Sequence, residues 1–170
     1  MVFMNQVVGL YSSVCAKLQS INTWLPQLAL RVLLAWELGE AGWEKWHGTN
    51  WFADITFPFP FNLLTPDISW ELATYFELAG AIALLLGIAT RFVSVSLMVL
   101  TVAAIAAVHW PQQWSSLSDL LMGYRIIDET GDGLGNYKLP LMYMVMFLPL
   151  LFGGAGKLSM DSFIQKGYRK

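Results

Sequence analysis

Three glutamates in residues 24–46 have a spacing that could do chemistry. Glu37, Glu40 and Glu44 recur every three or four residues, so an α-helix would place them on one face, within about 60° of arc. The segment is otherwise largely apolar and about as long as a bilayer crossing, which takes roughly 20 residues. Because an ionised side chain facing hydrocarbon costs on the order of 3 kcal/mol, we expect this stripe to face a bundle interior, a wet cavity or a metal ion.

Polar residues elsewhere in the chain are expected at the same depth as Glu37. Glu77 and His109 occur in two later apolar stretches, and both would reach the outer half of a small bundle. Two carboxylates close together in a low dielectric would share a proton or bind a cation. Alternatively, nearby hydroxyl or backbone groups satisfy each glutamate, and no chemistry follows. Arg31 lies deeper, about 22 Å from the outer end of its helix, so it pairs in the inner half or reaches toward the cytoplasm.

A metal site is the second interpretation of the acidic stripe. Glu44 and His47 have the carboxylate–histidine spacing of di-iron bundles, and Glu40 shares their face. A di-iron site needs a second such pair on another helix, which Ala106 and His109 do not supply. A single cation bound by Glu40, Glu44, His47 or His109 remains open, with copper as one candidate.

The composition predicts a membrane protein. The 170-residue chain is 56% hydrophobic and only 13% charged, whereas soluble domains average about 25% charged residues. Eight Trp and six Tyr suit the aromatic belts of membrane interfaces. A net charge of -2 without a basic run argues against nucleic acid as a partner. Cys15 is the only cysteine, which excludes an internal disulfide.

The hydropathy pattern predicts an all-α fold, a four-helix transmembrane bundle with both termini in the cytoplasm. Its spanning helices are expected at residues 24–46, 71–88, 92–110 and 139–156. The cytoplasmic side is assigned by Lys17, Arg91 and the basic C-terminal residues. The predicted units are an N-terminal amphipathic segment on the membrane (1–23), the membrane domain (24–161) and a basic cytoplasmic tail (162–170).

A proline- and phenylalanine-rich link joins the first two predicted helices. Residues 47–70 contain no Lys or Arg, so they suit the outer face of the membrane. Pro58, Pro60 and Pro66 prevent a continuous helix here. The phenylalanine rings would form a lid over the bundle or anchor the link in the interface.

Several short motifs along residues 24–161 together resemble the DoxX family. They are Arg31, Gly42-x-x-Lys45, Glu77-x-x-Gly80, Gly87-x-x-x-Arg91, His109 and the closing GAGKLSMD of residues 154–161. The stretches AWELGEAGWEKW, NWF and FPFPFNLL are similar to the HvfX-like branch of that family. By this resemblance Arg31, Glu77, Arg91, His109, Lys157 and Asp161 are family-typical positions. For Lys157 and Asp161 we favour a structural role, tying the end of the last helix to the cytoplasmic surface.

The resemblance implies a multi-pass protein of the bacterial inner membrane. The HvfX-like branch implies an accessory protein that assists maturation, export or redox handling of a modified copper-binding peptide, beside the enzymes that modify it. Other members resemble quinol-linked sulfur-oxidising subunits, so the alternative is a quinone-interacting redox subunit. Its cofactor would be bound by Arg31, Glu37, Glu77 and His109. A small proton-coupled transporter, which would need a homodimer, is a further alternative. No catalytic motif accompanies these residues.

Overall fold

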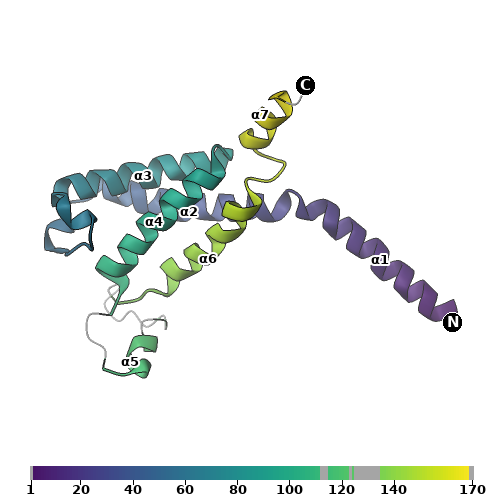
Figure 1. The fold of residues 1–170 in the computed structure, drawn as a ribbon, viewed down its shortest axis with the longest axis horizontal. Helices are drawn as coiled ribbons and strands as arrows, with labels where there is room; N and C mark the ends of the chain where they lie inside the picture. Colours follow the sequence, from purple (N-terminus) through teal and green to yellow (C-terminus); the bar gives the residue numbers. More distant parts are fainter. Residues whose placement is uncertain (1, 112–114, 123, 125–134, 169–170) are drawn as a thin grey trace.

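The computed structural model describes residues 2–111, 115–122, 124 and 135–168, and these form seven α-helices and no strand (Figure 1). The α-helices are α1 (Val2–Asn22), α2 (Leu25–His47), α3 (Pro66–Leu86), α4 (Thr90–Ala104), α5 (Leu117–Met122), α6 (Lys138–Gly153) and α7 (Met160–Tyr168). A π-helical turn, Ile105–His109, continues α4, and two 3-10 turns, Phe52–Asp54 and Phe61–Leu63, lie in the α2–α3 link. The prediction of an all-helical chain is confirmed.

The four helices α2, α3, α4 and α6 form a bundle whose two ends differ. Helix α2 packs along α3, and α4 packs along α6. The two pairs meet at one end and diverge toward the other (Figure 1). Both α1 and α7 leave from the end where the pairs meet, which we call the closed end. The core between the pairs is built from Leu34, Leu38, Leu84, Leu97, Phe147 and Leu150.

Helix α3 begins earlier than the sequence pattern indicated. We predicted a start at residue 71, but the helix starts at Pro66. The Thr65 hydroxyl accepts a hydrogen bond from the backbone N–H of Ile68 at 3.4 Å, so Thr65 is the N-cap. Proline suits the position that follows a cap, because the N–H it lacks has no partner within the helix. Pro66 therefore opens α3 and does not interrupt it.

Two helices among the described residues are long and apolar enough to cross a membrane, where the sequence predicted four. They are α3 and the continuous stretch Thr90–His109. Helix α6 is apolar but has only 16 residues, because Gly154 turns the chain at a φ of 77°. Helix α2 has 23 residues, but its five Asp, Glu, Lys and Arg side chains lower its hydropathy. The predicted four-span bundle is therefore only partly supported by length and composition.

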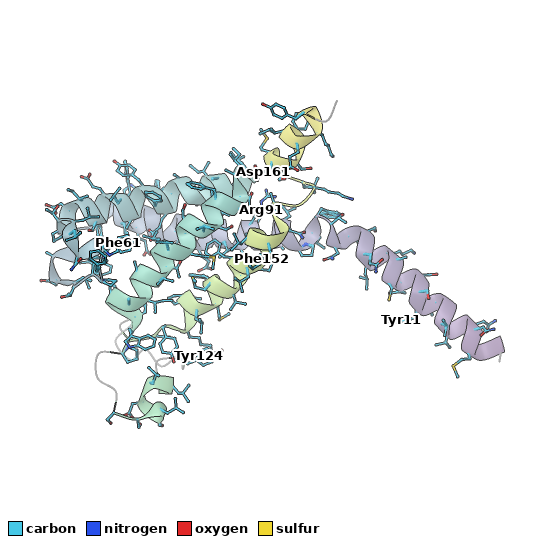
Figure 2. The ribbon with its side chains drawn as sticks, viewed as in Figure 1. Tyr11, Phe61, Arg91, Tyr124, Phe152 and Asp161 are labelled. Carbon is cyan, nitrogen blue, oxygen red and sulfur yellow. The ribbon has the colours of Figure 1, made fainter. Side chains whose placement is uncertain are left out.

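Helix α1 is the predicted N-terminal amphipathic segment. It extends away from the bundle (Figures 1 and 2), and its side chains Val7, Tyr11, Val14 and Leu18 are exposed. These residues recur at three- and four-residue intervals, so they form one apolar stripe that nothing in the described chain covers. Binding of this stripe to the membrane interface stays a prediction.

The Arg31 guanidinium lies buried at the closed end and joins three segments of the chain. The side chain is only 2% exposed. Its Nε donates to the Leu84 carbonyl at 2.7 Å and its Nη2 to that of Leu85 at 2.8 Å. Its Nη1 donates to the carbonyls of Ala155 and Leu158, both at 2.8 Å. One side chain on α2 thereby satisfies carbonyls at the end of α3 and in the segment before α7.

Gly87 allows the α3–α4 turn to approach Arg31. Its φ is 68°, a left-handed conformation that favours glycine. A Cβ at this position would lie 2.8 Å from the Arg31 Cζ and 2.6 Å from the Ser159 Cβ. Glycine is therefore required here both by its backbone conformation and by the lack of space.

Asp161 caps α4 from the start of α7. Its carboxylate accepts hydrogen bonds from the backbone N–H groups of Ala89, at 2.7 Å, and Thr90, at 2.9 Å. Ala89 precedes α4 and has no side chain that can cap a helix, so a distant carboxylate takes that role. Arg91 and Phe152 lie near Asp161 at this end (Figure 2). The structural role expected for Asp161 agrees with these contacts.

Replacement of Arg31 by methionine should strongly destabilise the fold. The change keeps most of the apolar volume but removes the guanidinium from four carbonyls, among which that of Leu84 keeps the Gly87 N–H at 3.1 Å. We expect this loss to cost about 3 kcal/mol or more. The midpoint of thermal unfolding in mild detergent, followed by tryptophan fluorescence, measures this. Arg91→Met is the matched control, since Arg91 is exposed and makes one 3.2 Å bond to the Phe152 carbonyl. Equal shifts for both variants would contradict the assigned role of Arg31.

Gly42→Ala should weaken the packing of α2 against α3. A Cβ on Gly42 would lie 2.9 Å from the Leu78 Cγ and 3.1 Å from the Glu77 Cβ, so the helices must move apart. We expect a loss of about 1–3 kcal/mol in the same unfolding assay. Gly39→Ala is the control, because its Cβ would lie 3.5 Å from Ala81, an ordinary contact. A more stable Gly42→Ala protein would contradict this account.

Candidate functional site

A cavity of about 880 Å³ lies between the two helix pairs of the bundle. Apolar side chains from α2, α3, α4, α6 and the α2–α3 link form most of its wall. Its ionisable residues are Glu37, Lys45, Glu77, His109 and Tyr143. The prediction that Glu37, Glu77 and His109 share one site agrees with this arrangement, because all three line the same cavity.

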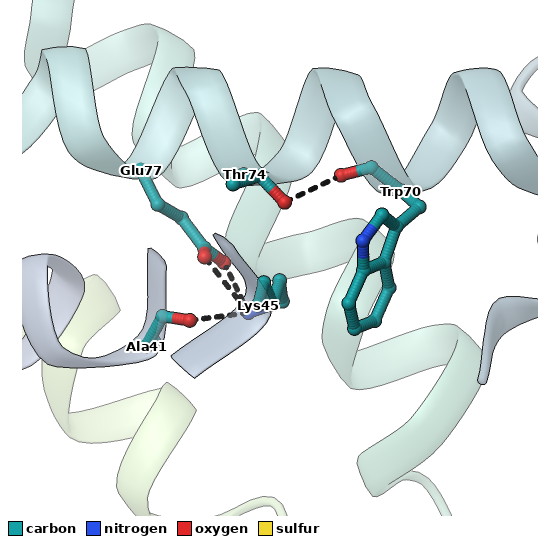
Figure 3. A network of polar contacts seen from close by, with 5 residues as sticks. All are labelled: Ala41, Lys45, Trp70, Thr74 and Glu77. Carbon is teal, nitrogen blue, oxygen red and sulfur yellow. Dashed lines mark hydrogen bonds and ion pairs between the residues drawn. The ribbon is translucent and has the colours of Figure 1, made fainter. Parts of the chain in front are cut away.

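Lys45 and Glu77 form an ion pair that joins α2 to α3 inside the cavity (Figure 3). The Lys45 Nζ lies 3.0 Å from Oε1 and 2.8 Å from Oε2 of Glu77, and 3.4 Å from the Ala41 carbonyl. The two side chains are only 16% and 11% exposed. Breaking such a shielded pair by removing one partner costs about 3–5 kcal/mol. Gly42 makes the pair possible, since it lets the backbones of the two helices approach.

Glu37, the other acidic residue of the cavity, is bonded to α6 and not to α3. The hydroxyl of Tyr143 donates a hydrogen bond to its Oε2, and the bond is partly buried. A hydrogen bond to a carboxylate is roughly twice as strong as one between neutral groups. Lys45 on α2 thus fixes Glu77 on α3, and Tyr143 on α6 fixes Glu37 on α2.

His109 ends the π-helical turn that follows α4 and lines the cavity from that side. A π-helical turn interrupts the regular α-helical spacing, and such turns are frequent at functional sites. The turn brings the imidazole into the wall that also holds Glu37 and Glu77.

Aromatic rings from the α2–α3 link complete the cavity wall. Trp51, Phe52, Phe57 and Phe61 all line it. Phe52 is the most buried of them, and its ring centroid lies 5.1 Å from that of Trp70 and 4.9 Å from that of Phe57. These edge-on and tilted contacts are favourable aromatic geometries. The rings that we predicted to form a lid or an interface anchor therefore lie against the cavity.

The other two glutamates of the stripe do not share the cavity. Glu40 and Glu44 are exposed and line no part of it, so the prediction that all three face one hollow is wrong. At 100° per residue, Glu37 sits at the edge of the inward face, and Glu40 lies 60° further from the bundle. His47 is also exposed, with its Nδ1 3.0 Å from the Trp43 carbonyl.

The predicted metal residues and the predicted cofactor residue Arg31 lie outside the cavity. Within the described ranges, no group of three or more His, Cys, Asp or Glu side chains is placed to hold a metal ion. A site at Glu40, Glu44 and His47 therefore stays a prediction without converging ligands. Arg31, predicted to bind a cofactor with Glu37, instead directs its donors at backbone carbonyls of the closed end and does not line the cavity.

Lys45 and Tyr143 are site residues that were not predicted from the sequence. A signal for Lys45 existed, since it is the only basic residue other than histidine in the outer half of its helix and belongs to the motif Gly42-x-x-Lys45. Tyr143 carried no such signal, because it is one of several large side chains in a continuous apolar run. The hydrogen bond of Tyr143 to Glu37 exists only because α6 lies beside α2.

Comparisons with known proteins test the family resemblance of the motifs. A family model described as DoxX matches residues 27–110. An uncharacterized protein of Haemophilus influenzae is 43% identical over 154 residues, which cover 89% of this chain and 91% of the relative. No solved structure matches. The family match supports the resemblance found in the motifs but names no HvfX-like branch. This chain belongs to the DoxX family of membrane proteins.

Proposed function

We propose that this protein binds a quinol, a lipophilic molecule with a hydroxyl-bearing ring, in the cavity between its helices. The observation that carries the proposal is a largely apolar cavity with two carboxylates held in its wall. Its volume of about 880 Å³ falls in the range of about 300–1,000 Å³ typical of small-molecule sites.

The hydrogen-bonding capacity of the cavity favours a ligand that donates. The Lys45 ammonium and the Tyr143 hydroxyl already donate to Glu77 and Glu37. Each carboxylate has about four acceptor positions, so acceptor capacity remains after these bonds. Hydroxyl groups of a quinol would fill it, with Glu37 and Glu77 as acceptors and His109 in the same wall. The aromatic rings of the link, among them Phe52 and Phe57, suit a flat ring.

The same features support a multi-pass placement in the bacterial inner membrane. On α2, Arg31, Glu37 and Lys45 are each bonded to other helices or to the closing segment, which lowers the cost of placing this charged helix beside α3, α4 and α6 in a bilayer. The helices α1 and α7 leave from one end of the bundle (Figure 1). That end carries Lys17 and Lys166, so the positive-inside tendency assigns it to the cytoplasm.

Assistance to a modified copper-binding peptide and its modifying enzymes, the role implied by the HvfX-like resemblance, is the second candidate. It is favoured by the outer face of α2, where Glu40 and Glu44 are exposed beside Trp36 and Trp43, which are 71% and 62% exposed. Carboxylates among indole rings suit a protein partner better than acyl chains, because charge facing hydrocarbon is costly.

Glu37→Gln should weaken quinol binding while leaving the fold intact. The amide keeps the size of the side chain and an acceptor for Tyr143 but loses the charge, so we expect Kd for a decyl-substituted ubiquinol to rise about tenfold. Anaerobic equilibrium dialysis with the protein in nanodiscs measures this constant. Glu40→Gln is the matched control on the same helix and should leave Kd unchanged. Wild-type protein that binds no quinol would refute the first candidate.

The second candidate is tested by variants of the exposed residues Glu40 and Glu44, with Glu37→Gln as the control. Affinity capture in mild detergent, with the products of neighbouring genes co-expressed, should recover the peptide or its modifying enzymes with wild-type protein. Changing Glu40 and Glu44 together to alanine should reduce recovery at least about threefold, since an acidic contact surface is lost. Glu37→Gln should not reduce it. Recovery of the peptide and its enzymes at background levels with wild-type protein would count against this candidate.

A further inference from the structure

A second hollow beside the cavity points to how a ligand with a long chain would be bound. We propose that this hollow, of about 480 Å³, holds the alkyl or isoprenoid tail of the molecule whose head lies in the cavity. The proposal rests on the proposed quinol binding and adds a tail subsite to it. We call the hollow the tail groove.

The tail groove is apolar throughout its lining. It is formed by the α2–α3 link, by one side of α4 and by one leucine of α6, and no ionisable residue is among them. The α4 residues Val95, Val99 and Val102 are 45–51% exposed, so the groove opens on the outside of the bundle. In the proposed membrane placement, this side of a helix apolar enough to cross a membrane would face hydrocarbon, and an apolar chain is the occupant that matches its chemistry.

The tail groove adjoins the cavity across a shared wall. Phe61, Val95, Val99 and Ala103 line both hollows. A chain attached to a ring in the cavity has to leave through apolar surroundings. The apolar tail groove lies on the other side of this wall. The shared wall is what distinguishes the tail groove from an ordinary lipid-facing depression.

Phe61 lies at the division between the two hollows. It begins the 3-10 turn Phe61–Leu63, whose backbone is held by bonds from Leu63 N–H to the Pro60 carbonyl and from Leu64 N–H to the Phe61 carbonyl, both at 3.1 Å. The ring is half-buried and lies between the link and α4 (Figure 2). A ligand that occupies both hollows therefore passes this ring.

Filling the tail groove tests the inference separately from the head site. Two ligands with the same quinol head, one with a decyl chain and one with a methyl group, are titrated anaerobically into nanodisc-bound protein. Affinity is expressed per mole fraction in the bilayer, so that partitioning of the chain into lipid cancels. In wild type we expect the decyl ligand to bind about tenfold more tightly, through packing contacts of the chain.

Val102→Trp fills the tail groove without lining the cavity. We expect it to remove most of the tenfold difference and to leave the methyl ligand at wild-type affinity. Ala106→Phe, one turn further along the same helix, fills the groove independently and should act alike. Ile82→Trp is the control, since Ile82 is 61% exposed on α3 and lines neither hollow.

The outcomes separate the two proposals. If both filled variants keep the wild-type difference between ligands, or if wild type shows none, the tail groove is refuted while the head site stands. If the methyl ligand fails to bind but the decyl ligand binds and is weakened by Val102→Trp, the head assignment is refuted and the groove supported. If neither ligand binds wild-type protein, both proposals are refuted.

Discussion

The buried guanidinium of Arg31 is the interaction on which the rest of the bundle depends. A buried cation costs several kcal/mol unless its donors are matched, and here four carbonyls match them. Two of these carbonyls, of Leu84 and Leu85, belong to the last turn of α3, where a helix lacks internal donors and its dipole favours positive charge. The same charge therefore stabilises both the end of α3 and the loop before α7.

Because the helices are tied together at the closed end, they can diverge at the other. The cavity lies in this divergent part of the bundle, where Lys45 links α2 to α3 and Tyr143 links α6 to α2. On α4 in this region, the Thr101 hydroxyl donates to the Leu97 carbonyl of its own helix. The contacts of α4 with the cavity are mainly apolar, and this is the side on which the tail groove opens.

Two groups of residues from the motifs that resemble the DoxX family have different physical roles. Arg31, Gly87 and Asp161 meet at the closed end, where they join α2, the α3–α4 turn and the start of α7. Gly42 and Lys45 act at the cavity, the glycine by allowing close approach of α3 and the lysine by pairing with Glu77. In this chain the motifs that resemble the DoxX family therefore combine residues that hold the bundle together with residues that line or adjoin its cavity.

The sequence alone predicted the helical class, which the described residues confirm, and it favoured a structural role for Asp161, which agrees with the bonds of its carboxylate to Ala89 and Thr90. It also predicted that Glu37, Glu77 and His109 would meet, because depth along a helix follows from a constant rise per residue. Depth says nothing about rotation around the helix axis or about which helices become neighbours. Those are set by how side chains of facing helices interlock, which is a property of the packed bundle.

Tertiary structure therefore decided the remaining features of the site. It turned Glu37 inward and Glu40 outward, although periodicity placed them on one face. It gave Lys45 and Tyr143 their acidic partners, and it directed the donors of Arg31, whose depth already placed it in the inner half, at carbonyls of the closed end. The physical reason is that a buried charged side chain needs a hydrogen-bonding or oppositely charged partner. Which groups are close enough to be that partner is decided only when the helices pack.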